Sequence, residues 1–83
     1  MDRTEIINEI KEIIIKSMDL QKEPSEIIGH DLINEIGINS IDALEIFVWI
    51  ENKFEIQIED EDLSDELLNS IDSLADYIIK KKA

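Results

Sequence analysis

Apolar residues recur every three or four positions in three stretches of this chain, and that spacing limits what it can fold into. The stretches cover residues 4–18, 40–54 and 70–80, and none contains glycine or proline. Such spacing gives a helix one apolar face, which must be buried against another apolar surface. We therefore predict an all-α bundle, and 83 residues suffice for a single domain, residues 1–83. The predicted buried faces consist of Ile6, Ile7, Ile10, Ile13, Ile14 and Met18, then Ala43, Ile46, Phe47, Ile50 and Phe54, and finally Ile71, Leu74, Ala75, Ile78 and Ile79.

A shorter third helix is predicted from about Asp60 to Leu67, because Leu63 and Leu67 stand four positions apart. Before it, Ile56 and Ile58 alternate with polar residues, as in an extended segment. The candidate capping residues are Asp2 or Thr4 for the first helix and Ser70 for the last. The expected fold is a small four-helix bundle, with three longer helices, one short third helix and a long first loop.

Residues 19–39 form that long first loop. Pro24 suits the first turn of a short helical piece, which Gly29 can end. A structureless loop of this length is unusual in a compact domain, so we expect a packed one. The residues expected to hold it down are Ile28, Leu32 and Ile36.

The chain is strongly acidic, with 21 acidic residues against 8 basic ones and a net charge of −13. Nucleic-acid binding is excluded, because it needs clustered Lys and Arg, and an anionic membrane surface is disfavoured for the same reason. The expected partner is a basic patch on another protein. The sequence shows no cysteine, no signal peptide and no apolar run long enough to span a membrane, which favours a cytoplasmic protein. We expect this protein to be a monomer.

The acidic run at residues 59–66 invites comparison with a calcium-binding loop. An EF-hand loop begun at Asp60 or Asp62 needs glycine at its sixth position and glutamate at its twelfth. The residues at those positions are Asp65 and Ile71 in the first register, and Leu67 and Ser73 in the second. We therefore predict no metal site and interpret the run as a solvated acidic face, to which divalent ions can bind only loosely.

No catalytic residues are predicted. His30 is the only histidine, and a Ser-His-acid triad also needs a shaped pocket and an oxyanion hole. The residues around Ser40 do not form the Gly-x-Ser-x-Gly elbow of many hydrolases. We interpret His30 as an ordinary loop residue.

Ser40 lies where a loop turns into the helix at 40–54. It can be a simple helix N-cap, but Asn39 beside it can cap equally well. A helix N-terminus also stabilises an anion, so a serine there is suited to carry a phosphate ester. The helix that it opens has a second feature, because Ile41 and Val48 point away from its buried face and Leu44 lies between the two faces. This apolar strip is either a set of scattered surface residues or a docking strip.

These residues carry a resemblance to the acyl carrier protein family. The segment Asn39-Ser40-Ile41-Asp42-x-x-Glu45-Ile46 resembles the carrier signature Asp-Ser-Leu-Asp-x-x-Glu-Leu. Gly37, Glu51, Phe54 and the tail Ile71-Asp-Ser-Leu-Ala-Asp-Tyr-Ile78 continue the match. The resemblance covers essentially the whole chain in length, acidity and helix order.

The resemblance implies that Ser40 Oγ carries 4′-phosphopantetheine, which a phosphopantetheinyl transferase moves from coenzyme A. The arm would supply the thiol that the chain lacks, and acyl groups would be bound to that thiol as thioesters. The protein itself would catalyse no reaction. The implied partners are acyl-transferring and acyl-modifying enzymes with basic docking patches, in fatty-acid or related polyketide, peptide or specialised lipid synthesis.

The resemblance also implies which residues meet partners and cargo. The implied docking residues are Ile41, Asp42, Leu44, Glu45, Val48 and Glu51. The candidate lining for a sheltered acyl chain is Phe47, Ile50, Leu63, Leu67 and Ile71, with Phe54 deeper, although the same residues are ordinary core without a ligand.

Two residues depart from the family signature: Asn39 replaces aspartate and Ile41 replaces leucine. Asparagine keeps the capping ability but removes one negative charge from the recognition site. The segment between Ile58 and the last helix is also longer than in common fatty-acid carriers, which affects the third helix and the acyl pocket. Asn39 is the support for an alternative, an unmodified acidic helical interaction module that docks on a basic protein partner.

Overall fold

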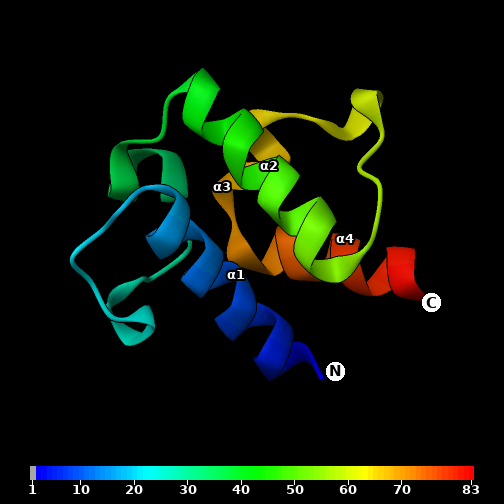
Figure 1. The fold of residues 1–83 in the computed structure, drawn as a ribbon, viewed down its shortest axis with the longest axis horizontal. Coiled ribbons are helices and arrows are strands. Elements are labelled where there is room, and N and C mark those ends of the chain that lie inside the picture. The colour runs from blue at the N-terminus through cyan, green and yellow to red at the C-terminus, as the bar shows by residue number, and fades with distance from the viewer. Residues whose placement is uncertain (1) are drawn as a thin grey trace.

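The computed structural model describes residues 2–83, whose regular structure is helical. Four α-helices follow one another (Figure 1): α1 (Arg3–Ser17), α2 (Ser40–Phe54), α3 (Asp65–Asn69) and α4 (Ile71–Lys82). Three short helical turns stand between them: η1 (Pro24–Glu26), η2 (Ile33–Gly37) and η3 (Asp60–Asp62). Helix α1 packs against α2 and α4, while α3 packs against α4 and η2. The predicted four-helix bundle is confirmed.

The apolar faces of the long helices meet in one core. Its most deeply buried members, each at most 1% exposed, include Ile10 and Ile14 from α1, Ile46 and Ile50 from α2, and Leu74 and Ile78 from α4. Burying each such side chain contributes roughly 1.5–3 kcal/mol. Ile79 belongs to the predicted face of the last helix but is 40% exposed, so that face is narrower than predicted.

Side-chain caps fix where the long helices begin. Of the two candidates for α1, Asp2 is the cap, and its carboxylate accepts the backbone N–H of Glu5 at 2.9 Å. The hydroxyl of Ser70 caps α4 as predicted and accepts the N–H of Ser73 at 3.3 Å. Each bond satisfies an N–H group that has no partner within its own helix.

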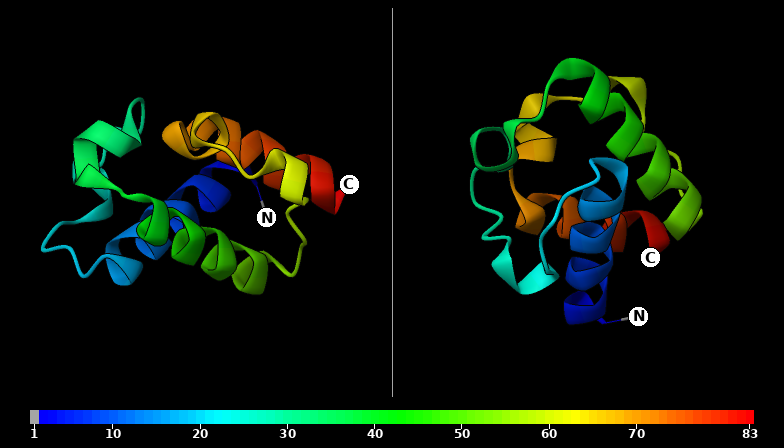
Figure 2. Two further views of the ribbon diagram at one scale, coloured as in Figure 1. Left: turned by 90° about the horizontal axis from the view of Figure 1, so that it is seen from above. Right: turned by 60° about the vertical axis from the view of Figure 1, so that its left-hand side comes forward.

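The first loop is packed, as predicted, but one of its three predicted anchors is wrong. Leu32 is fully buried, whereas Ile28 is 73% exposed and Ile27 is buried instead. The cause is the extended backbone at Ile27, because successive side chains of an extended chain point to opposite sides. The carboxylate of Glu35 then holds the loop by accepting the N–H groups of Ile28 and Gly29 at 2.8 and 2.9 Å. Figure 2 shows this loop at one side of the helices.

Hydrogen bonds tie the first loop to the second half of the chain. The N–H of Ile33 donates to the side-chain oxygen of Asn69 at 2.8 Å, and the N–H of Ile71 donates to the carbonyl of Gly29 at 3.0 Å. A hydrogen bond from the Asn34 side chain, helped by Asn69, lowers the pKa of Asp31. These hydrogen bonds therefore join the loop that precedes Ser40 to α3 and α4, which follow it in the chain.

The single short helix predicted over residues 60–67 is wrong in its extent, because two shorter pieces stand there. The chain is extended at Ser64, whose hydroxyl accepts the N–H of Leu67 at 3.1 Å and so begins α3. A serine favours a cap over a helix interior, and this explains the interruption. The buried face of this helix also differs from the predicted one, because Leu68 is fully buried while the predicted Leu67 is only half-buried.

Tyr77 of α4 holds the segment that precedes α3. Its hydroxyl donates to the carboxylate of Asp62 at 2.7 Å and accepts the N–H of Glu59 at 3.3 Å. Burial, together with the bond to Asp62, raises the pKa of the phenol. The acidic run is thus anchored to the bundle by a neutral group.

We expect added salt to stabilise the fold. Within residues 2–83, ion pairs join Arg3 to Asp72 and Asp76, Lys53 to Glu9, and Lys81 to Glu59. They engage only four of the 21 acidic residues, so repulsion among the others remains. Salt screens such repulsion over about 10 Å at 0.1 M. Thermal unfolding followed by circular dichroism should show Tm rising by about 5 °C between low and moderate NaCl, which corresponds to about 1 kcal/mol for this chain length. A flat or falling Tm would contradict this expectation.

Candidate functional site

Ser40 is the first residue of α2, but it is not the helix cap. The side chain of Asn39 accepts the N–H of Asp42 at 2.8 Å, and the Asp42 carboxylate accepts the N–H of Asn39 at 3.3 Å. This reciprocal capping box satisfies the helix start without the serine. Within residues 2–83 the Ser40 hydroxyl makes no hydrogen bond, and the residue is exposed. The serine is therefore free for chemistry.

The backbone before Ser40 turns at a glycine. Gly37 ends η2 with a φ of +81°, a conformation that residues with a side chain rarely adopt. The N–H of Ile38 then donates to the carbonyl of Ile33 at 3.1 Å and closes the turn. This geometry brings the chain out of η2 and into α2 at Ser40.

Two small cavities flank Ser40, between α2 and the region of α3. One, of about 200 Å³, is lined by Ile33, Ile38, Asn39, Ser40, Ala43, Asp65 and Leu68. The other, of about 270 Å³, is lined by Ser40, Ala43, Leu44, Phe47, Leu63, Ser64 and Asp65. Two of the predicted lining residues, Phe47 and Leu63, thus line a cavity beside Ser40. The other predicted lining residues do not line these cavities, and Ile50 and Ile71 are buried in the core.

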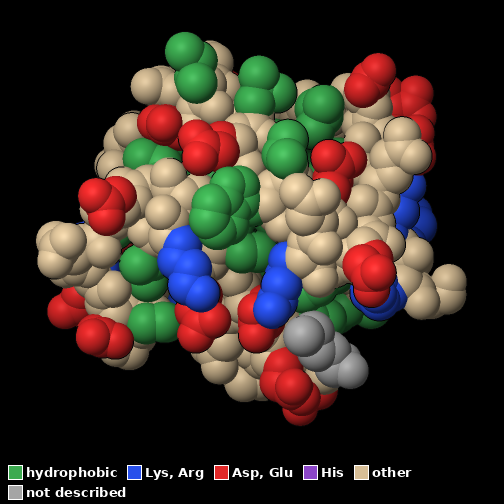
Figure 3. All heavy atoms as spheres, viewed as in Figure 1, with side chains coloured by type: hydrophobic (Ala, Val, Ile, Leu, Met, Phe, Trp, Pro, Cys, Tyr) green, Lys and Arg blue, Asp and Glu red, His purple; other side chains and the backbone are tan. Residues whose placement is uncertain are grey.

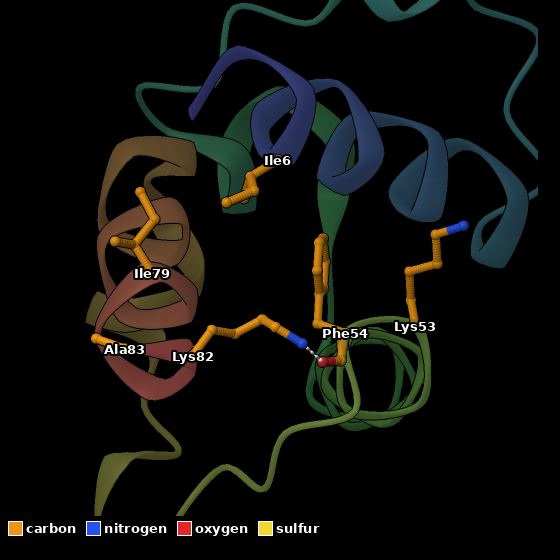
Figure 4. A pocket seen from close by; sticks show the side chains of 6 residues that line it. All are labelled: Ile6, Lys53, Phe54, Ile79, Lys82 and Ala83. Carbon is orange, nitrogen blue, oxygen red and sulfur yellow. Dashed lines mark hydrogen bonds between the residues drawn. The ribbon is translucent and has the colours of Figure 1, made fainter. Parts of the chain in front are cut away.

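Phe54, predicted to lie deep in that acyl pocket, instead lines a larger cavity of about 450 Å³ at the other end of α2. Figure 4 shows its walls, which include Ile6 of α1 and Ile79 of α4. The ammonium group of Lys82 points across it and donates to the carbonyl of Phe54 at 2.9 Å. Because α2 rises about 21 Å between Ser40 and Phe54, this cavity is not part of the serine site. Lys82 instead satisfies the carboxyl end of α2.

The exposed apolar strip predicted on α2 is present. Ile41, Leu44 and Val48 are 76%, 58% and 50% exposed. Hydrophobic side chains lie along α2 in Figure 3, with acidic groups around them. Trp49, which is not among the predicted docking residues, is 38% exposed and extends the apolar surface at one flank of the strip. Its position four residues after the exposed Glu45, on the same helix face, is the signal that could have revealed it.

The three acidic residues predicted to rim this strip differ in what their carboxylates do. Asp42 belongs to the capping box. Glu51 accepts the N–H of Ile58 at 2.9 Å and so holds the segment after α2. Glu45 is exposed and forms no hydrogen bond or ion pair through its side chain within residues 2–83. Glu45 alone of the three is therefore unengaged inside the described chain.

This difference predicts separate effects for two similar substitutions. Glu51→Ala leaves the part-buried N–H of Ile58 without its acceptor and should lower the free energy of unfolding by about 1–2 kcal/mol. Glu45→Ala removes an exposed, unpaired charge and should change it by less than about 0.5 kcal/mol. Urea unfolding of both variants measures the difference. Equal losses would show that the Glu51 contact contributes little.

Other candidate chemistry finds no support at this site. His30 is exposed in the first loop and lines neither cavity beside Ser40. Within residues 2–83, no group of three or more His, Asp or Glu side chains is placed to hold a metal ion. Across the same residues, every helix is too short or too polar to cross a membrane.

The comparisons with known proteins bear directly on the serine. The sequence profile of the family described as "Phosphopantetheine attachment site" matches residues 8–78. The chain belongs to this family. It is therefore a non-catalytic carrier whose cofactor is covalently attached 4′-phosphopantetheine. Its exposed, unbonded serine at a helix start fits the attachment of such a group.

Individual relatives agree with that assignment. An acyl carrier protein of Chlorobium phaeovibrioides is 33% identical over 98% of this chain and 100% of its own length. One from Buchnera aphidicola subsp. Acyrthosiphon pisum is 34% identical over 87% of this chain and 86% of its own. Among solved structures, the acyl carrier protein of Enterococcus faecalis is similar in fold, with a TM-score of 0.72, 24% identity and coverage of 98% and 99%. The carrier is thus an acyl carrier protein by relationship, and its enzyme partners belong to synthesis pathways.

Proposed function

We propose that Ser40 is the residue that carries 4′-phosphopantetheine. The strongest support is that Asn39 caps the start of α2. The Ser40 hydroxyl is therefore not needed as a cap and remains exposed, without a hydrogen bond. A phosphodiester there would face the N-terminus of a 15-residue helix, whose dipole favours negative charge. Attachment would join Ser40 Oγ to the phosphate of the pantetheine arm and release the adenosine bisphosphate part of coenzyme A.

The arm supplies a terminal thiol that can hold an acyl group as a thioester. The chain's own part is to fix the arm at the helix start and to offer apolar space beside it. Phe47 and Leu63 line one cavity at Ser40, and Leu68 lines the other. These volumes, about 270 and 200 Å³, would shelter the near part of an acyl chain.

The docking surface of this carrier is the exposed strip on α2. It consists of Ile41, Leu44 and Val48, with Asp42, Glu45 and Glu51 as its acidic rim. Its partners would be a phosphopantetheinyl transferase and acyl-transferring or acyl-modifying enzymes with basic patches. The charges would mainly speed encounter, while the apolar strip provides the contact area. We place the carrier in the cytoplasm, as a monomer, in fatty-acid or a related lipid, polyketide or peptide synthesis.

Incubation with coenzyme A and a broad-specificity phosphopantetheinyl transferase tests the proposal. Mass spectrometry should show a gain of about 340 Da, the mass that the formula of one phosphopantetheine group adds to a serine. Proteolysis should place the added mass on the peptide that contains Ser40. No gain with several transferases, or a gain on another peptide, would refute the assignment.

A further inference from the structure

Trp49 is an aromatic residue of α2 that is partly exposed at the flank of the proposed docking strip. It is the only tryptophan of the chain and is 38% exposed. It lies nine residues after Ser40, about 13 Å further along the helix. Tryptophan is enriched among the residues that contribute most to protein–protein binding, so its exposure on this helix points to a contact.

Trp49 and Glu45 form one composite surface. They stand four residues apart on α2, so they share one helix face. The Glu45 carboxylate has no partner within residues 2–83. Lys53, one turn beyond Trp49, is directed toward α1 by Glu9 at 3.2 Å. Lys53 therefore does not neutralise Glu45, and the helical spacing places an aromatic residue and an unpaired carboxylate on one face of α2.

We propose that Trp49 and Glu45 together bind one arginine side chain of a partner enzyme. The planar guanidinium group can stack on the indole while its N–H groups donate to the Glu45 carboxylate. Lysine is a poorer match, because its compact ammonium group cannot stack and form a two-point contact at once. The inference rests on the proposed docking role of α2. It adds that this carrier prefers partners with an arginine at this position.

A double-mutant cycle tests the single-arginine contact. The probe is the phosphopantetheinyl transferase of the organism that produces this carrier, titrated calorimetrically against the Ser40→Ala chain, so that binding is measured without modification. Trp49→Leu and Glu45→Gln should each raise Kd by about tenfold. Because one guanidinium group makes both contacts, the double variant should bind only about as weakly as either single variant.

A matched control comes from another exposed apolar residue. Ile28 is 73% exposed but lies in the first loop, so Ile28→Ala should leave Kd unchanged. Fluorescence of the sole tryptophan should also change when the transferase binds, and this change should be smaller in Glu45→Gln. Two additive tenfold losses would show two separate contacts and overturn the proposal. A change below twofold for Trp49→Leu, or no binding by the Ser40→Ala chain, would also overturn it.

This experiment is independent of the attachment test. If Ser40 gains no phosphopantetheine but the cycle shows coupling, the attachment proposal fails and the arginine contact stands. If Ser40 is modified in the wild-type chain but the cycle shows no coupling, the arginine contact fails and the attachment stands.

Discussion

We expect Ser40→Ala to abolish loading: after incubation with coenzyme A and a transferase, its mass should stay that of the unmodified chain. The wild-type chain should gain about 340 Da, the increment of one phosphopantetheine group. The reason is chemical, because alanine has no oxygen to form the phosphodiester. The variant should fold normally, since the Ser40 hydroxyl has no hydrogen-bonding partner within residues 2–83 and Asn39 supplies the helix cap.

Ser73→Ala is the matched control for this loss. Ser73 is also exposed and also lies in the first turn of a helix, α4. If any exposed serine at a helix start could be loaded, replacing Ser73 would lower the yield, whereas we expect no change. A Ser40→Ala chain that still gains the full mass, with an unaltered far-ultraviolet spectrum, would move the attachment site elsewhere.

We expect Gly29→Ala to lower the free energy of unfolding by about 3 kcal/mol. A Cβ atom at Gly29 would lie 2.7 Å from Cδ1 and 2.9 Å from Cγ1 of Ile71, which is only 4% exposed and has little room to move. Overpacking of this kind costs about 1–3 kcal/mol. The φ of +85° at Gly29 adds about 1–2 kcal/mol for a residue with a side chain. The substitution also strains the hydrogen bond from the N–H of Ile71 to the carbonyl of Gly29.

Gly37→Ala separates backbone strain from crowding. Gly37 has a similar φ of +81°, but a Cβ atom there would meet no atom within 4 Å. Its substitution should therefore cost about 1–2 kcal/mol, from the backbone alone. Urea unfolding of both variants gives the comparison. Equal losses would mean that Ile71 moves aside easily and that the first loop is not tightly fitted to α4.

Much of the fold could be predicted because it depends on local pattern. The periodicity of residues 40–54 predicted α2 with its observed bounds, and the capping chemistry of Ser70 predicted the start of α4. The wrong predictions concern residues that could adopt either of two local structures. Ser64 could continue a helix or cap the next one, and only its bond to the N–H of Leu67 shows which it does.

The features of the candidate site also fall into those that local sequence pattern predicted and those that it could not predict. The helix wheel alone predicted that Ile41 and Val48 point away from the core, with Leu44 between the two faces, and all three are exposed. It could not separate Glu45 from Glu51, because the two differ only in that the N–H of Ile58 reaches Glu51 through a segment that folds back. Residue type likewise left open whether Asn39 or Ser40 caps α2.

By itself, then, the sequence determined the helical bundle, the acidic surface and the place of Ser40 at a helix start, since each follows from residue types at short spacing. The tertiary structure decided that Ile27 rather than Ile28 is buried, that Phe54 lies at the far end from Ser40, and that Trp49 remains exposed. These outcomes depend on which distant segment covers a given side chain, and short-range spacing carries no information about that.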